Sequence, residues 1–192
     1  MALLLVGVLI ASCSCFANTW IKPPMQTLEG YPVPQPNTPA VSPDAHGAHP
    51  QYAIEWWYWV GHLKGTLSGE DFGFQSTIFR LAGAPSSLVL QPEAQVAFGD
   101  HQLYMSHAAL SELTKQRYQS VERINREGWQ AHASTGKLDI TSTPIRVFES
   151  NSTATFELDF RLPDNVQVEL SLQPRKPLVI FGERGLSRKG SD

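Results

Sequence analysis

Alternation of apolar and polar residues is the clearest pattern in the chain, and it predicts β-strands. Residues 154–162 and 166–173 each carry an apolar side chain at about every second position, and Pro163-Asp164-Asn165 separates the two runs. This pattern is typical of an antiparallel hairpin with one buried face. A second hairpin is predicted over residues 52–80, with its turn at Ser68-Gly69-Glu70-Asp71.

The first strand of this second hairpin is apolar on both of its faces. Residues 56–59 are four consecutive aromatics, which favour pleated surfaces and bury much area. Alternation gives one face with Trp56, Tyr58 and Val60 and another face with Trp57, Trp59 and Leu63. The hairpin is therefore either the core of a sandwich or the wall of a barrel with an aromatic-lined interior.

Shorter strands are predicted between and after the two hairpins. The candidates are residues 88–90, 95–98, 103–110, 129–132 and 137–141. Residues 113–126 are ambiguous, because a helical stripe is formed by Leu113, Arg117, Val121 and Ile124, whereas Tyr118 and Arg123 fit a strand. About eight short strands with little helix favour an all-β barrel or sandwich.

Length, charge and cysteine content narrow the class of protein. The chain has 192 residues, of which 42% are hydrophobic and 17% charged, enough for one domain with a sizeable core. Its net charge of -3 gives no basis for a nucleic-acid partner. Cys13 and Cys15 both precede the predicted strands, which excludes a disulfide or thiolate metal site there. The spacing of His46 and His49 before Glu55 matches no zinc motif, and we predict no metal and no cofactor.

The amino-terminal residues predict export to the periplasm or cell envelope. Residues 1–12 hold an apolar run well below the ~20 residues that span a bilayer, and we interpret them as a removed signal segment. Ile10-Ala11-Ser12-Cys13 resembles a lipoprotein processing box, which would make Cys13 the lipidated first residue and a membrane anchor. Ordinary cleavage after Ala17 is the alternative.

Residues 13–43 predict a Pro-rich tether between this anchor and the domain. Eight of the 14 prolines lie between Pro23 and Pro50, and proline removes the backbone donor that regular structure needs. The alternative is an irregular arm packed across the domain.

Several short motifs resemble those of one protein family. In order they are Asp44-Ala45-His46-Gly47-Ala48-His49-Pro50, Glu55-Trp56-Trp57-Tyr58, Gly61-His62-Leu63, Phe72-Gly73-Phe74-Gln75, Phe79-Arg80, then residues 104–112, 176–180 and 185–190. They resemble the secreted lipocalin-like proteins that include the bacterial carotenoid 1,2-hydratases (hydroxyneurosporene synthases) and the AttH-type predicted secreted hydrolases. The resemblance implies a lipocalin-like antiparallel β-barrel over residues 44–180, the amino-terminal half of a two-barrel protein.

The resemblance also implies a partner for this half. Residues 181–192 are rich in glycine and charge and resemble the start of a linker to a second barrel, so we expect either a fragment or a natural short form. The carotenoid hydratases add water to an isoprenoid double bond without a cofactor. The family's acid and its Asp-His-Glu-Trp signature belong to the second half. The resemblance therefore assigns no catalytic residue to this chain, and we expect this chain alone to be inactive.

Glu55 is the one candidate in this half for acid chemistry. A carboxylate beside four aromatics is partly desolvated, which suits proton donation. The alternative is a structural ion pair between Glu55 and Arg80, since a buried charge needs a partner. The sequence contains no Gly-x-Ser-x-Gly elbow, so it gives no support to a nucleophilic hydrolase.

An apolar ligand, either an isoprenoid or another lipid, is the predicted partner of the aromatic hairpin. Its predicted contacts are Trp56, Tyr58, Phe72 and Phe74, with Gln75 and His107 as polar groups facing a lumen. The sequence thus predicts an exported lipocalin-like domain that binds this ligand and supports a hydratase second half. One alternative is a non-enzymatic lipid-binding envelope lipoprotein linked to an ABC-type export system. Another is a barrel that its own aromatics fill and that binds nothing.

We predict lipidation at Cys13. Protein extracted from membranes should have lost residues 1–12 and gained the mass of acyl chains, because the processing box ends at that cysteine. Intact-mass spectrometry measures both changes. A mature form that begins at Asn18 would contradict the prediction, and a Cys13→Ser variant should remain unmodified.

Overall fold

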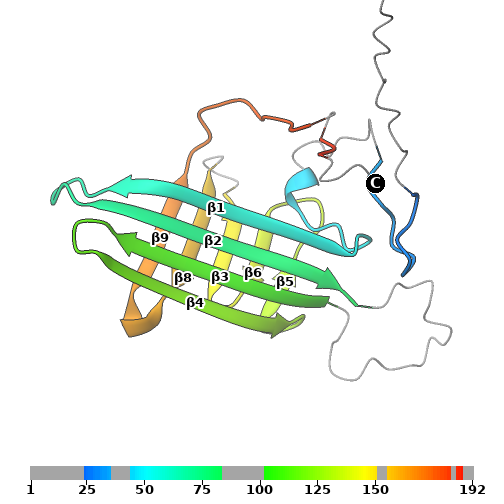
Figure 1. The fold of residues 1–192 in the computed structure, drawn as a ribbon, viewed down its shortest axis with the longest axis horizontal. Coiled ribbons are helices and arrows are strands. Elements are labelled where there is room, and N and C mark those ends of the chain that lie inside the picture. Colours follow the sequence, from blue (N-terminus) through cyan, green and yellow to red (C-terminus); the bar gives the residue numbers. More distant parts are fainter. Residues whose placement is uncertain (1–23, 36–43, 84–101, 151–154, 183–184, 188–192) are drawn as a thin grey trace, which may run out of the picture.

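The computed structural model describes residues 24–35, 44–83, 102–150, 155–182 and 185–187. Their regular elements are almost all strands, arranged in two antiparallel sheets (Figure 1). The first sheet contains β1 (Ile54–Lys64), β2 (Asp71–Ala82), β3 (Gln102–Glu112) and β4 (Arg117–Arg126). The second contains β5 (Ala131–Ala133), β6 (Asp139–Ser142), β7 (Ile145–Glu149), β8 (Phe156–Arg161) and β9 (Gln167–Leu172). Two short 3-10 turns, η1 (Asp44–His46) and η3 (Pro163–Asn165), complete the described elements.

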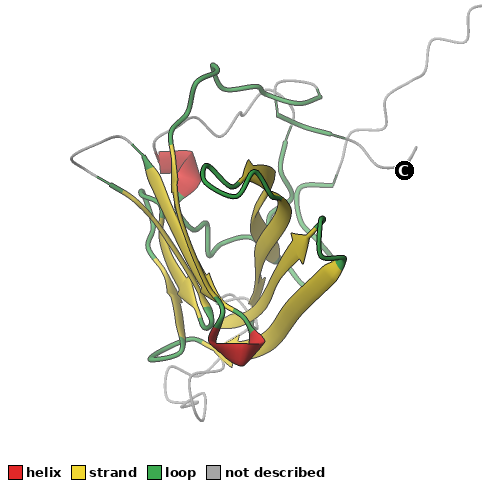
Figure 2. Cartoon of the chain, turned by 90° about the vertical axis from the view of Figure 1, so that its left-hand side faces the viewer, coloured by secondary structure: helices red, strands yellow, loops and turns green. Residues whose placement is uncertain are grey.

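Each strand pairs with its neighbours in sequence, so the chain forms an up-and-down meander. The two sheets face each other across the core (Figure 2). The chain passes from the first sheet to the second between β4 and β5, where Glu127 and Ala131 form an isolated β-bridge. Among the described strands β1 pairs only with β2 and β9 only with β8, so the wall is not closed between β1 and β9. The predicted all-β antiparallel fold is confirmed, although the barrel is open on this side.

Both predicted hairpins are present. β1 and β2 pair from Ile54 with Leu81 to Lys64 with Asp71, and η3 forms the turn between β8 and β9. In that turn Asp164 and Asn165 adopt a positive φ of 57°, which asparagine and aspartate tolerate better than most residues.

Three other sequence predictions have different outcomes. The ambiguous residues 113–126 form a turn and then strand β4, in which Val121 packs on the core while Ile124 is exposed. Strand β7 was not predicted, because it is short and begins directly after Pro144. The strand candidates at 88–90 and 95–98 lie outside the described residues.

The inner faces of both sheets form one hydrophobic core. The first sheet contributes Phe74, Ile78, Tyr104 and Ala108, and the second contributes Ala131, Ile140, Ile145, Val147, Leu158, Phe160 and Val168. Burial of apolar surface contributes roughly 25 cal/mol per Å² to folding, so this shared core holds the sheets together. Trp57 and Trp59 pack against it from β1. The chain's own side chains thus fill the space between the middle strands.

A small polar network also joins the sheets inside this core. The Ser106 hydroxyl donates to the backbone oxygen of Ser142 at 2.9 Å and lies 2.5 Å from its hydroxyl oxygen. The Asn125 amide donates to the same hydroxyl at 2.9 Å and to the Thr143 carbonyl at 2.6 Å. Buried polar groups need such partners, and here the partners connect β3 and β4 to β6.

The segment before β1 crosses from one sheet to the other. Gly47 and Ala48 are buried, and the Ala48 amide donates to the Ser134 carbonyl in the β5–β6 loop at 2.8 Å. A Cβ atom on Gly47 would lie 2.6 Å from the Gly136 nitrogen and 2.8 Å from the Lys137 nitrogen. Only glycine allows this approach of two backbones.

Residues 24–35, within the predicted tether, form an arm against the domain. The Val33 amide donates to the Met25 carbonyl at 3.0 Å, and Gln26 and Pro32 form a bridge. Tyr31 is buried at 8% exposure. These residues are packed as an arm, whereas residues 13–23 and 36–43 lie outside the described part of the chain, so the tether over residues 13–43 stays a prediction. Within the described part of the chain no helix has the length and apolarity needed to cross a membrane.

We expect Gly47→Ala to destabilise the fold. Its Cβ would meet backbone atoms, which cannot rotate away, so the free energy of unfolding should fall by about 2 kcal/mol or more. Urea-induced unfolding measures this change. Gly73→Ala is the matched control, since its Cβ would meet nothing nearer than Ser111 Cβ at 3.9 Å. Equal unfolding midpoints for the two variants would show that the close backbone contact at Gly47 does not contribute to stability.

Candidate ligand-binding site at the start of strand β1

Arg80 is a buried cation at the end of β2, with only 1% of its surface exposed. Its Nε donates to Glu55 Oε2 at 3.0 Å, and its Nη1 donates to Gln102 Oε1 at 2.6 Å. Its Nη2 donates to two backbone carbonyls, those of His49 and Tyr52, each at 2.9 Å. A buried guanidinium is tolerated only with partners of this kind. Arg80 therefore joins β1, β3 and the loop before β1 at one point.

Glu55 completes this cluster from β1. Its Oε1 lies 2.6 Å from His49 Nδ1, and its Oε2 accepts from the His49 amide at 2.9 Å as well as from Arg80. The ion pair expected between Glu55 and Arg80 is thus present in the structure. Both carboxylate oxygens are occupied by donors from the chain itself. This geometry suits a fixed anchor, whereas the proton donor considered above needs an oxygen that faces a substrate.

Tyr104 adds a neutral hydroxyl beside this cluster, on β3 opposite Arg80. Burial, together with the Glu127 and Glu55 carboxylates, raises the pKa of Tyr104 to about 12, and the Arg80 guanidinium opposes this rise. The hydroxyl therefore remains protonated at neutral pH. It adds no second negative charge near Glu55.

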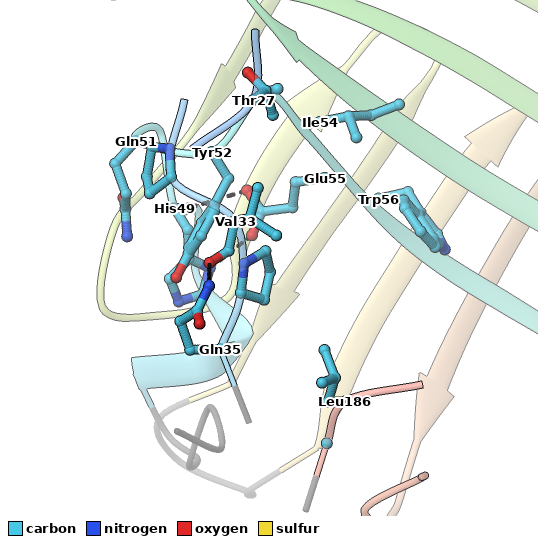
Figure 3. Close-up of a pocket in the computed structure, with 14 residues that line it drawn as sticks. Thr27, Val33, Gln35, His49, Gln51, Tyr52, Ile54, Glu55, Trp56 and Leu186 are labelled. Atoms are coloured by element: carbon cyan, nitrogen blue, oxygen red, sulfur yellow. Dashed lines mark hydrogen bonds and ion pairs between the residues drawn. The ribbon is translucent and has the colours of Figure 1, made fainter. Parts of the chain in front are cut away.

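A cavity of about 630 Å³ lies directly outside this cluster. The segments that surround it are the arm, the loop and first residues of β1, and the described residues near the carboxyl terminus (Figure 3). Its lining residues are Thr27, Pro32, Val33, Pro34, Gln35, His49, Gln51, Tyr52, Ala53, Ile54, Glu55, Trp56, Gly185 and Leu186. Most of this wall is apolar, and its polar groups include His49 and Glu55. Such a combination is typical of a small-molecule site.

A second cavity, of about 290 Å³, follows the open edge of β1. Its lining residues are Ala45, His46, Trp56, Trp57, Tyr58, Trp59, Leu138 and Phe156. The Trp57 indole donates to the His46 carbonyl at 3.1 Å, and the His46 ring meets Phe156 edge-on at 5.4 Å. These contacts connect Trp57 of β1 and Phe156 of β8 through His46.

The six residues predicted to line one lumen lie on two faces of the first sheet. The connection between β1 and β2 pairs Lys64 with Asp71, so each even-numbered residue of β1 pairs with an odd-numbered residue of β2. Paired residues share a face. Phe72 and Phe74 therefore face the core, and the outer face carries Trp56, Tyr58, Gln75 and His107. Trp56 lines both cavities and Tyr58 lines the smaller one; the other four line neither.

The outer face of the first sheet is strongly apolar. Large exposed side chains lie along it on β1 and β4, namely Ile54, Trp56, Tyr58, Val60, Tyr118 and Ile124. Phe79 stands between Trp56 and His107, with ring-centroid distances of 6.4 and 5.7 Å. The outer face of the second sheet instead carries residues such as Arg146, Glu157, Asp159 and Glu169. An apolar outer face on one sheet alone indicates a contact surface.

Sequence reasoning identified part of this site. It selected Glu55, Arg80 and Trp56 but considered His49 as a zinc ligand and not as a partner of Glu55, and it gave the arm no role at the site. The signal for His49 was weak, since its distance to Glu55 depends on how the loop folds. No group of three or more His, Cys, Asp or Glu side chains among the described residues is arranged to hold a metal ion.

We predict that Arg80→Lys destabilises the protein by about 3 kcal/mol. An ammonium group can replace neither the bond to Gln102 nor the paired bonds to the His49 and Tyr52 carbonyls while it contacts Glu55. Urea-induced unfolding measures the loss. Arg146→Lys is the control, because Arg146 is exposed on β7. A similar small effect of both substitutions would contradict the role given to Arg80.

Comparison with known proteins agrees with this architecture. A family model described as AttH-like matches residues 33–192. The crystal structure of an AttH-type protein from Nitrosomonas europaea is similar, with a TM-score of 0.66 and 29% sequence identity. The similarity covers 84% of this chain and 45% of that one, so the chain spans less than half the length of that relative. No curated protein matches the chain. The chain belongs to the AttH-like family and has its lipocalin-like fold.

Proposed function

We propose that this chain is an exported AttH-like domain that binds an apolar molecule in the cavity at the start of β1. The observation that carries the proposal is the cavity itself, about 630 Å³ with a largely apolar wall and a fixed polar cluster at one side. Ligand pockets of proteins commonly combine these features in volumes of about 300 to 1,000 Å³. An isoprenoid or another lipid fits that description.

The ligand would lie outside the sheet rather than between the sheets. The middle of the domain is filled by the shared core, whereas Ile54 and Trp56 present half or more of their surface outward. Ile54 is 51% exposed and Trp56 54% exposed, and both line the cavity. Covering these two side chains with an apolar molecule removes that surface from water, which is the main driving force we invoke.

We also propose that this domain supports a second half in a longer protein and that any hydratase chemistry belongs to that half. The proposal is supported by the relative from Nitrosomonas europaea, of which this chain covers 45%. The apolar outer face of the first sheet is a suitable surface for that second half. Glu55, with both oxygens held by donors, offers no proton to an alkene in this half.

A non-enzymatic lipid carrier at the cell envelope is the second candidate. The same cavity supports it, because an apolar site beside an anchored carboxylate requires no reaction. Export and lipid anchoring belong to residues 1–13, which lie outside the described part of the chain, and they remain proposals from the sequence. The two candidates differ in whether the longer protein converts the bound molecule or only holds it.

A fluorescence titration tests the binding proposal. A long-chain alcohol or an acyclic isoprenoid should change tryptophan emission saturably, and Trp56→Ala should weaken binding by about tenfold, because Trp56 supplies a large part of the apolar wall. Trp129→Ala is the control, since Trp129 is 92% exposed and lies between β4 and β5. Unchanged emission across all ligands would refute the proposal, as would equal effects of the two substitutions.

A further inference from the structure

The Glu55 carboxylate determines which nitrogen of His49 carries a proton. His49 Nδ1 lies 2.6 Å from Glu55 Oε1. The other oxygen of the same carboxylate already accepts from the His49 amide and from Arg80. A carboxylate in this arrangement is an acceptor, so Nδ1 must be the donor. In a neutral imidazole the second nitrogen, Nε2, then has a free lone pair.

That second nitrogen is the part of His49 that remains available. The backbone amide of His49 donates to Glu55, its carbonyl accepts from Arg80, and its Nδ1 is held by Glu55. Nε2 forms no hydrogen bond with any described residue, although the ring lines the cavity and its side chain retains 29% exposure. Loop, ring and tautomer are therefore all fixed, which leaves Nε2 as the acceptor that the His49 ring offers.

We propose that His49 Nε2 accepts a hydrogen bond from the hydroxyl group of the bound molecule, which is thus an apolar alcohol. This inference rests on the proposed apolar site and adds the chemistry of its polar end. Glu55 acts as a positioning residue, because it orients the imidazole and does not contact the ligand. The chain beyond the hydroxyl lies against the apolar wall that contains Ile54, Trp56 and Leu186 (Figure 3).

The charges around the cavity disfavour an acidic head group. The described residues that line it include Glu55 but neither lysine nor arginine. Arg80 is 1% exposed, and its guanidinium is already bound by Glu55, Gln102 and two carbonyls. Among the described lining residues, a carboxylate or phosphate would thus meet a negative charge and no cation. A neutral hydroxyl has no such cost and brings the donor that Nε2 lacks.

The experiment compares three probes of equal chain length: 1-decanol, its methyl ether and decanoate. Binding is measured by tryptophan fluorescence at about pH 8.5, above the range in which imidazoles ordinarily titrate. The ether has the same apolar chain as the alcohol but no donor. The ratio of alcohol affinity to ether affinity therefore reports the hydrogen bond. The two probes differ in hydration, but this difference is the same for every variant and cancels when the ratios of two variants are compared.

The informative substitution is His49→Asn. The asparagine amide lies near the position of Nδ1, so it can still donate to Glu55, whereas the acceptor at Nε2 is removed. We expect the alcohol-to-ether ratio to fall about fivefold in this variant, the worth of one hydrogen bond of about 1 kcal/mol. His132→Asn is the matched control, because His132 is an exposed histidine on β5 that does not line the cavity, and its ratio should be unchanged.

Each result decides the inference. An unchanged ratio in His49→Asn, or an equal fall of the ratio in His132→Asn, would overturn the role of Nε2, whereas saturable binding would leave the proposed apolar site standing. Decanoate binding more tightly than decanol would overturn the choice of an alcohol. Absence of binding by all three probes would refute the site and this inference together. Nitrogen NMR gives a ligand-free check, since a proton on Nε2 of neutral His49 would also overturn the inference.

Discussion

The buried guanidinium of Arg80 is the interaction on which the start of β1 depends. A cation removed from water costs several kcal/mol unless all its donors find acceptors. The acceptors of Arg80 come from β1, from β3 and from the two carbonyls of His49 and Tyr52. Because these segments are far apart in sequence, satisfying one side chain fixes their relative positions. The cavity wall is a consequence of that arrangement, since its loop cannot move without leaving charge unpaired.

Two backbone features extend this constraint to the rest of the fold. Gly47 lets the segment before β1 touch the β5–β6 loop, so the cluster around Arg80 is also tied to the second sheet. Gly61 has a similar role within the first sheet, where the Phe74 ring lies over it; a Cβ there would be 2.8 Å from a ring carbon. Glycines in the motifs before and within β1 are thus explained by packing. Arg80 and Glu55 supply the charge that the packing encloses.

The sequence was sufficient for the two hairpins but not for strand β7 or for the arrangement of the site. The alternation in β8 and β9 and the aromatic run of β1 predict their hairpins directly, because a strand's side-chain period is a local property. The register of β1 against β2 decides which of their side chains share a face, and it depends on the exact pairing across the turn. The sequence alone therefore could not place Trp56, Tyr58, Phe72 and Phe74 on the correct faces. Likewise, the contacts of His49 and of the arm are set by tertiary packing. The pairing of Glu55 with Arg80 was predictable, since a buried carboxylate in an aromatic strand requires a cation.

Trp56 connects the two surfaces that this domain leaves uncovered. It lies on the apolar outer face of the first sheet, with its ring tilted against that of Phe79, and it also forms part of the cavity wall. A second half packed on the outer face would therefore cover one side of Trp56 while a ligand covers another. Each would bury apolar surface that the other leaves partly exposed, so the two would stabilise each other through that side chain. Ligand binding and the docking of a second half are in this way expected to be coupled, with the indole of Trp56 as the shared contact.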